Sequence, residues 1–174
     1  NRLIELGLQL KYVLNTHGHH DHANGNEEMK KLSGREALGF GGTDPDTGIQ
    51  LVDGAELPLG KLSVNIIHTP GHTEDSTCFL VGDALFTGDT LFVGKVGGTG
   101  FGDDAKTEFH SLREKLMRLP DQTRVFPGHD VGLKPHSTIG HEKATNPFLL
   151  RSNYDDFLDL KKNWLAYKEE HGIA

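Results

Sequence analysis

Apolar and polar residues alternate in short stretches along the chain, and this pattern predicts several short β-strands. In residues 62–67 every second position is apolar (Leu62, Val64 and Ile66), as expected for a strand that buries one face. A Gly-Asp pair at residues 82–83 separates two apolar runs and indicates a hairpin with a tight turn. The same criteria predict further strands over residues 11–15, 49–52, 77–81, 84–87 and 124–126.

Helical spacing of apolar residues predicts three helices. Residues 106–119 carry apolar side chains three or four positions apart, and Pro120 ends this pattern. The other two helices are predicted over residues 26–32 and 153–170. Ser152, with an aspartate three residues later, predicts a capping box at the start of the last helix. Short strands that alternate with helices indicate a layered α/β domain.

Composition and charge exclude several classes of protein. The 174 residues fit one domain, and the longest apolar run, residues 78–81, is too short for a transmembrane helix. The single cysteine, Cys78, excludes an internal disulfide and a cysteine-based zinc site. A formal net charge of -7 argues against nucleic-acid and anionic-membrane surfaces. We therefore expect no nucleic-acid or membrane partner. Separately, the protein is expected to be cytoplasmic and to act on a small molecule.

The eleven histidines are the most informative part of the composition, because four of them lie within six residues around Asp21. This segment directly follows a predicted strand, and α/β domains place their sites on such loops. In an extended loop His17 and His19 point to one side, and His20 points away. Asp21 and His22 can then face a second point nearby. The alternative is a solvated histidine cluster without function.

Three further segments each present one side chain just beyond a predicted strand. Pro-Gly-His turns carry His72 and His129, and a glycine precedes Asp89. A carboxylate such as Asp89 can bridge two cations, because both of its oxygens carry lone pairs. Nitrogen and carboxylate ligands without sulfur suit zinc, iron or manganese. The candidate metal ligands are therefore His17, His19, Asp21, His22, His72, Asp89 and His129. The other histidines are expected to be structural or surface residues. Two of them could also lie next to the ligands: His20, for which exposure to solvent is the alternative, and His68.

The order and spacing of these motifs resemble the metallo-β-lactamase superfamily. The matching segments are His17-x-His19-x-Asp21-His22, Pro70-Gly71-His72-Thr73, Gly88-Asp89-Thr90-Leu91-Phe92 and Pro127-Gly128-His129. They look most like the glyoxalase II (hydroxyacylglutathione hydrolase) branch and the related persulfide dioxygenases. The resemblance runs from about residue 8 to residue 150. It implies an α/β (α+β) fold of four αβ/βα layers, in which two mixed sheets lie between helices.

The resemblance also implies which ligands share an ion. Metal 1 would be held by His17, His19 and His72, metal 2 by Asp21, His22 and His129, and Asp89 would bridge them. Two divalent metal ions are the expected cofactors, with zinc first and iron or manganese as alternatives. Asp21 and Asp89 are the expected catalytic residues, since Asp21 would orient a metal-bound hydroxide as well as bind a metal.

Members of this branch carry strands before their first helix, and we expect such strands upstream of residue 1. Residues 1–150 are expected to form the metal-binding catalytic domain. Residues 151–174 are expected to add a C-terminal helix packed on that domain.

The chemistry favours a thioester hydrolase of the glyoxalase II type. A metal-bound hydroxide attacks at neutral pH without a protein base, and a thiolate leaves easily because a thiol pKa lies near ~8.5. The alternative is a mononuclear iron(II) persulfide dioxygenase that uses His17, His72 and Asp89 as a two-histidine, one-carboxylate triad.

The residues that would bind substrate match the pattern of these related enzymes less well than the metal ligands do. The basic and aromatic residues with which glyoxalase II enzymes bind glutathione are absent after Asp89, and no aromatic follows His129. The arginine-rich loop of the dioxygenases is also absent after Asp89. Lys95 is the only cation in that region, and it is the candidate for binding a substrate carboxylate. A solvated loop lysine is the alternative.

Overall fold

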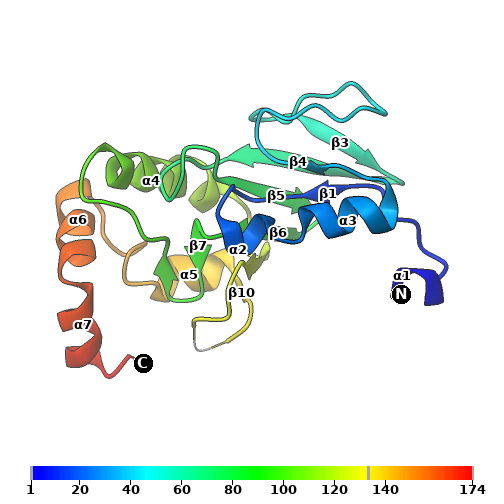
Figure 1. Ribbon diagram of the computed structural model, residues 1–174. Helices are drawn as coiled ribbons and strands as arrows, with labels where there is room; N and C mark the ends of the chain where they lie inside the picture. The colour runs from blue at the N-terminus through cyan, green and yellow to red at the C-terminus, as the bar shows by residue number, and fades with distance from the viewer. Residues whose placement is uncertain (1, 133, 174) are drawn as a thin grey trace.

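The computed structural model describes residues 2–132 and 134–173, and a mixed β-sheet of six strands lies at its centre (Figure 1). Its strands lie in the order β10-β9-β6-β5-β4-β3. They span Glu56–Leu59 (β3), Leu62–His68 (β4), Thr77–Val81 (β5), Ala84–Gly88 (β6), Arg124–Pro127 (β9) and Ser137–Thr138 (β10). Neighbouring strands are antiparallel except β6 and β9, which are parallel.

Two smaller strand pairs and seven α-helices complete the described part of the chain. The parallel pair consists of β1 (Val13–Leu14) and β2 (Ala37–Leu38), and the antiparallel pair of β7 (Leu91–Phe92) and β8 (Lys95–Val96). The helices are α1 (Arg2–Glu5), α2 (His20–Ala23), α3 (Asn26–Ser33), α4 (Asp103–Glu114), α5 (Ile139–Thr145), α6 (Tyr154–Lys162) and α7 (Trp164–His171). A 3-10 turn (Leu116–Arg118) follows α4. The mixed α/β fold expected from the sequence is confirmed.

The sheet separates two hydrophobic cores. One core joins the sheet to α4, α5 and α6 and contains Leu85, Leu112 and Phe157. The other core lies against the β1–β2 pair. Cys78 and Phe79 are neighbours in β5 but belong to opposite cores, as the alternation of side chains along a strand requires.

Local signals correctly predicted several elements. The hairpin at residues 82–83 joins β5 to β6, and Gly82 has a positive φ of 59°. Helix α3 ends at Gly34, which adopts the left-handed conformation. Helix α4 begins at Asp103 and ends at Glu114, so it starts earlier and stops sooner than the predicted helix over residues 106–119.

One strand prediction is wrong and one strand was missed, each for an identifiable reason. Residues 49–52 form no strand, although Leu51 is fully buried. The backbone of Leu51 instead bonds to Gly41 and Gly42, because the preceding loop folds back on this segment. Strand β3 was not predicted, and it contains Pro58. Proline is tolerated there because β3 lies at an edge of the sheet.

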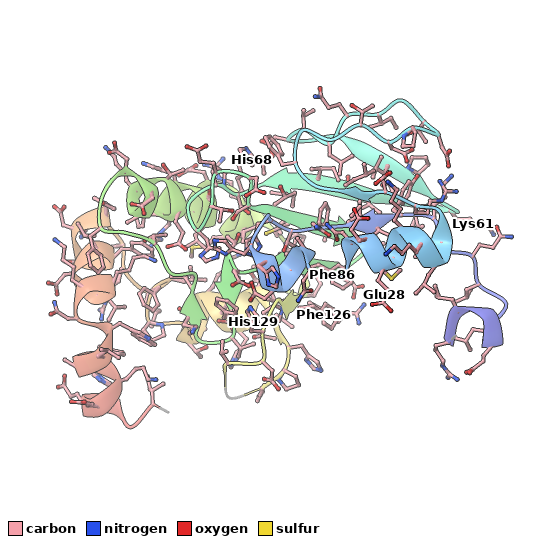
Figure 2. All side chains as sticks on the ribbon, in the orientation of Figure 1. Glu28, Lys61, His68, Phe86, Phe126 and His129 are labelled. Atoms are coloured by element: carbon pink, nitrogen blue, oxygen red, sulfur yellow. The ribbon has the colours of Figure 1, made fainter. Side chains whose placement is uncertain are left out.

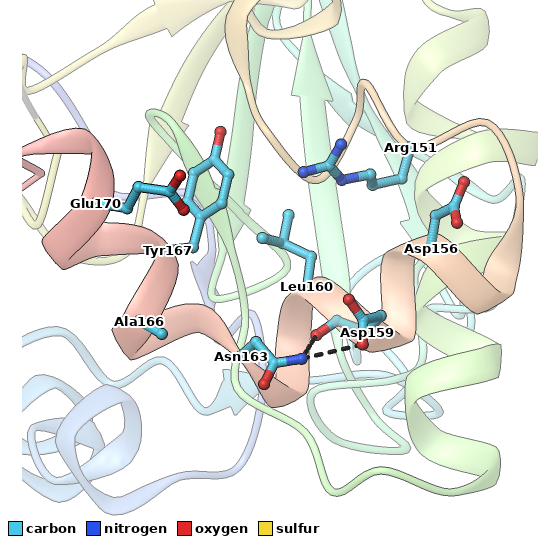
Figure 3. A pocket seen from close by; sticks show the side chains of 8 residues that line it. All are labelled: Arg151, Asp156, Asp159, Leu160, Asn163, Ala166, Tyr167 and Glu170. Atoms are coloured by element: carbon cyan, nitrogen blue, oxygen red, sulfur yellow. Dashed lines mark hydrogen bonds between the residues drawn. The ribbon is translucent and has the colours of Figure 1, made fainter.

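The predicted C-terminal helix is divided into α6 and α7 at Asn163 (Figure 3). The side-chain amide of Asn163 donates to both the carbonyl and the carboxylate of Asp159, each at 3.0 Å. The N-terminal cap is also displaced by one position from the predicted box. The side chain of Asn153, not Ser152, accepts from the amide N–H of Asp156 at 2.9 Å.

No helix in the described part of the chain combines the length and apolar character needed to span a bilayer.

Phe86 of β6 is 44% exposed and stacks on Phe126 of β9, with ring centroids 5.5 Å apart. Both residues are labelled near His129 in Figure 2. They lie within β6 and β9, the two strands that lead into Asp89 and His129.

Candidate metal centre

Four loops bring the candidate ligands to one edge of the sheet. Strands β4, β6 and β9 run in the same direction, because β4 and β6 both pair antiparallel with β5 and β9 is parallel to β6. Their carboxyl ends therefore meet at one edge and lead into His72, Asp89 and His129. The loop after β1 reaches this edge because the amide N–H of Thr77 donates to the carbonyl of Thr16 at 2.8 Å.

One group of side chains consists of three imidazoles. The Nδ1 atom of His19 lies 3.0 Å from Nε2 of His17 and 3.0 Å from Nε2 of His72. His17 is buried, whereas His19 is exposed at the rim. These are the three residues expected to hold metal 1, and one atom of each lies close enough to share an ion.

A second group consists of Asp21, His22 and His129. The Nε2 atoms of His22 and His129 are 3.1 Å apart, and Nε2 of His129 lies 3.2 Å from Oδ2 of Asp21. Partial desolvation raises the pKa of Asp21, but the hydrogen bond from its own backbone amide and the nearby His22 outweigh this, so its pKa is lowered. Asp21 is therefore ionised at neutral pH.

Asp89 lies between the two groups. Its Oδ2 atom is 3.7 Å from Nε2 of His72 and 3.5 Å from Nε2 of His129. Its Oδ1 atom is 3.3 Å from Nε2 of His22. One carboxylate thus faces residues of both groups, which is the arrangement that a bridging ligand needs.

The donor atoms of this cluster fit cations. Nδ1 of His72 donates to the carbonyl of Gly98 at 2.7 Å, so Nε2 keeps its lone pair and points at His19. Burial, together with His22, lowers the pKa of His17 to about 4, so this imidazole is neutral at pH 7. Oδ1 of Asp89 is buried and has no hydrogen-bond partner among the described residues. A divalent metal ion would accept the lone pairs of the converging imidazole nitrogens and would give the unpartnered carboxylate oxygen of Asp89 a ligand interaction.

Two glycines next to the ligands are required by close packing. A Cβ atom on Gly128 would lie 2.5 Å from Oδ1 of Asp89 and 2.8 Å from Cε1 of His22. Gly88 has a φ of 48°, and a Cβ atom there would lie 2.5 Å from Oγ1 of Thr16. The sequence predicts a turn at Gly128, whereas only the folded chain shows that its backbone packs against the ligands.

A buried ion pair beneath the His72 loop was not predicted from the sequence. Nζ of Lys161 in α6 lies 2.5 Å from Oε2 of Glu108 in α4, with side chains 6% and 0% exposed. Lys161 also donates to the carbonyl of Gly97 at 2.7 Å, one residue before the carbonyl that orients His72. Burial raises the pKa of Glu108 to about 7, although Lys161 acts to lower it. The pair therefore supports the segment that orients a candidate ligand.

Three other residues discussed in the sequence analysis lie outside the cluster of candidate metal ligands. His20 is exposed and belongs to none of the candidate metal groups in the described chain. His68 stacks on Phe40 at 3.7 Å, and its Nε2 faces the carbonyl of Glu74 at 2.7 Å. It thus contacts the loop that carries His72 without facing the ligands. Lys95 lies in β8, and its ammonium is 5.0 Å from the ring centroid of Phe92.

His20 provides a test of which side chains of the first motif bind metal. We expect His20→Ala to keep its metal content near that of the original protein, because this imidazole points to solvent. His19→Ala is the matched variant and should lose metal from the first group. Metal analysis after gel filtration measures both, and a large metal loss in His20→Ala would contradict the assignment.

Comparison with known proteins identifies the class to which this fold and cluster belong. The chain matches the Metallo-beta-lactamase superfamily over residues 2–35 and 32–129. A Schizosaccharomyces pombe protein named probable hydroxyacylglutathione hydrolase glo2 is 34% identical over 181 residues, which cover 82% of this chain and 68% of that protein. Human mitochondrial persulfide dioxygenase ETHE1 is 32% identical over 163 residues, which cover 91% of this chain and 64% of that protein.

A solved structure shows the same fold. The crystal structure of ETHE1 from Myxococcus xanthus superposes with a TM-score of 0.82 at 34% identity, covering 94% of this chain and 73% of that chain. The chain belongs to the metallo-β-lactamase superfamily, an enzyme family whose members bind divalent metal ions. Its relatives include both hydroxyacylglutathione hydrolases and persulfide dioxygenases, as the sequence motifs predicted. The chain spans about two thirds of the length of the two curated relatives described above.

Proposed function

We propose that this chain forms the catalytic site of a glyoxalase II-like thioester hydrolase with two divalent metal ions. The observation that carries the proposal is the position of the Asp89 carboxylate, whose oxygens lie 3.3–3.7 Å from imidazoles of both groups. Hydrolases with two metals use such a carboxylate to hold both ions near one reacting centre. The similarity to hydroxyacylglutathione hydrolases points to the same reaction class.

The side chains of this site have separate tasks in that reaction. Divalent cations, when bound, supply hydroxide at neutral pH and polarise the carbonyl of the substrate. Asp21 is exposed and ionised, so its carboxylate can accept a hydrogen bond from the attacking water and orient it. Asp89, which is mostly buried, keeps the two imidazole groups at a fixed separation.

No protein nucleophile is needed. Cys78, the only cysteine, is fully buried, and burial raises its pKa to about 11. It therefore cannot supply a thiolate to a substrate. A thioester suits this site because its thiolate departs with little protonation, since an ordinary thiol has a pKa near ~8.5.

A persulfide dioxygenase is the second candidate. The 32% identity to human ETHE1 over most of this chain favours it, at nearly the same level as the hydrolase relative. His17, His72 and Asp89 would supply the two-histidine, one-carboxylate set that binds iron(II) in oxygenases. In that reaction the other four candidates would not be metal ligands: His19, Asp21, His22 and His129.

One experiment separates these two functions. The protein is loaded with zinc or, without oxygen, with iron(II), and its metal content is measured. Release of thiol is then followed with acyl-glutathione and acyl-coenzyme A thioesters, and oxygen uptake with glutathione persulfide. We expect two metal ions per chain and thiol release without oxygen uptake. One iron per chain with persulfide-dependent oxygen uptake and no thiol release would overturn the hydrolase proposal.

A further inference from the structure

The turn that carries His72 packs directly on helix α4. The hydroxyl of Ser111 in α4 donates to the carbonyl of Pro70 at 2.7 Å. A Cβ atom on Gly71 would overlap the Cβ and the backbone of Glu108, so no space separates the turn from the helix. The position of α4 therefore fixes the backbone of His72, but it does not fix the rotation of the imidazole ring.

The ring of His72 is oriented by the segment of residues 97–98. Its Nδ1 donates to the carbonyl of Gly98 at 2.7 Å. This segment has no regular secondary structure, and the bond from the amide of Gly97 to the carbonyl of Thr90 is long, at 3.4 Å. It lies between the ligand and α4, since a Cβ atom on Gly97 would be 3.1 Å from Cβ of His72 and 3.0 Å from Oε1 of Glu108. A further contact is needed to hold it in one position.

Lys161 of α6 supplies that contact. Its ammonium donates to the carbonyl of Gly97 at 2.7 Å and lies 2.5 Å from Oε2 of Glu108. The side chain is 6% exposed and also faces the rings of Phe148 and Phe157, at 5.9 and 5.4 Å from their centroids. A buried ammonium with these partners has one defined position, because moving it would leave a buried charge unpaired. Lys161 therefore fixes the carbonyl of Gly97.

Helix α6 is itself anchored on α4. The rings of Phe157 in α6 and Phe109 in α4 have centroids 5.3 Å apart, and the two helices lie side by side in Figure 1. The match to the superfamily ends at residue 129, so α6 lies beyond the matched region. Neither Glu108 nor Lys161 belongs to the motifs that carry the ligands. Their contribution to the metal centre comes from the packing of this chain.

We propose that Lys161 is a positioning residue of the metal centre. Through the carbonyls of Gly97 and Gly98 it orients His72, and it thereby determines how tightly the first group of ligands holds its ion. The second group is held by other elements, because His22 lies in α2 and His129 follows β9. The inference rests on the metal binding included in the proposed function, and it applies to either reaction considered there.

Two variants separate the bond to Gly97 from the stability that the ion pair provides. Glu108→Gln keeps the ammonium and its bond to Gly97 but removes the buried counter-ion, so it should be less stable than the original. Lys161→Met combined with Glu108→Gln removes the bond and leaves no buried charge, so it should be more stable than Lys161→Met alone. Lys162→Met is the control, because Lys162 is exposed in the same helix.

Metal affinity is measured by titrating the metal-free proteins with cobalt(II), followed by visible absorption and calorimetry. We expect Lys161→Met and the double variant to bind one of the two ions about 10–100-fold more weakly, as when a hydrogen-bonded partner of a ligating histidine is removed. The original, Glu108→Gln and Lys162→Met should bind both ions alike. Adding Lys161→Met to His72→Ala should cause no further loss, because a residue that acts through His72 is not additive with it.

The tautomer of His72 gives a readout that needs no metal. The carbonyl of Gly98 selects the form protonated at Nδ1. Heteronuclear NMR of the histidine side chains should show this form in the metal-free original and Glu108→Gln proteins. A mixture of the two tautomers is expected in Lys161→Met and in the double variant.

Three results would overturn the inference. These are full cobalt affinity in both proteins that lack Lys161, an affinity that falls in Glu108→Gln and recovers in the double variant, or an undiminished effect of Lys161→Met in the His72→Ala protein. If a single variant does not fold, the double variant decides by its affinity and its tautomer. Failure of the hydrolase reaction is a separate result, because the original would bind metal while no thioester released thiol. An original protein that binds no metal would overturn both proposals.

Discussion

Replacing Asp89 with Asn is expected to lower thioester turnover by about 10³-fold or more and to reduce the metal content below two ions per chain. The carboxylate faces both imidazole groups, and an amide offers one weaker acceptor oxygen in its place. Loss of several kcal/mol of charge stabilisation corresponds to this factor, at about 1.4 kcal/mol for each tenfold. Metal analysis and a thiol-release assay measure the two effects.

The metal-free Asp89→Asn protein should nevertheless fold. Oδ1 of Asp89 has no hydrogen-bond partner in the described chain, so removing its charge costs the apo protein little. The variant should instead lose the rise in Tm that metal gives to the original protein. Asp130→Asn is the matched control, because Asp130 is exposed and directly follows His129. Full turnover in Asp89→Asn, or equal loss in Asp130→Asn, would contradict the bridging role.

Replacing Lys161 with Met is expected to destabilise the protein by about 3–5 kcal/mol, because it leaves the carboxylate of Glu108 buried without a partner. For a chain of this size, such a loss lowers Tm by roughly 6–20 °C. Thermal unfolding of the metal-free protein measures it. Lys162→Met is the matched control, since Lys162 is exposed and its loss should leave Tm nearly unchanged.

The double variant Lys161→Met with Glu108→Gln should recover much of this stability, because no charge then remains buried. The effect should also depend on pH. Burial raises the pKa of Glu108 from 4.5 to about 7, so the folded protein keeps a proton that the unfolded chain has released. Stability therefore falls as pH rises from 4.5 toward 7, and more steeply without Lys161. Equal Tm values for Lys161→Met and Lys162→Met at pH 7 would refute the structural role of the pair.

Local features of the sequence were sufficient for much of the fold. The period-2 pattern of residues 62–67 and the Gly-Asp turn at residues 82–83 predicted β4 and the β5–β6 hairpin, because both signals act between near neighbours. The same hydrophobic-pattern criterion wrongly predicted a strand over residues 49–52. Leu51 is apolar because the second core buries it, but its segment pairs with the preceding loop through one isolated bridge and not with a strand. A segment must be both buried and paired with a neighbouring strand to form part of a sheet. A short apolar run in the sequence indicates only the burial.

Helix boundaries were predicted less well, because their signals compete over a few residues. Asp104 accepts hydrogen bonds from the amides of Gly100, Gly102 and Ala105. These bonds help α4 to begin at Asp103, before the start at residue 106 that the apolar spacing predicts. Asn163 breaks the last helix through its side-chain bonds to Asp159, whereas the apolar stripe continues across it. Side-chain bonds to the backbone compete with helix continuity, and hydrophobic periodicity does not record them.

The sequence by itself determined which side chains are available at the candidate metal centre, because each follows an apolar run and strand ends place their loops at a sheet edge. Only the tertiary structure brought Asp89 between the two imidazole groups and buried Glu108 against Lys161. These contacts join residues up to 67 positions apart, the separation of His22 and Asp89 in the printed sequence. They depend on strand order and helix packing, and a lone charged residue in a helix carries no local sign of its distant partner.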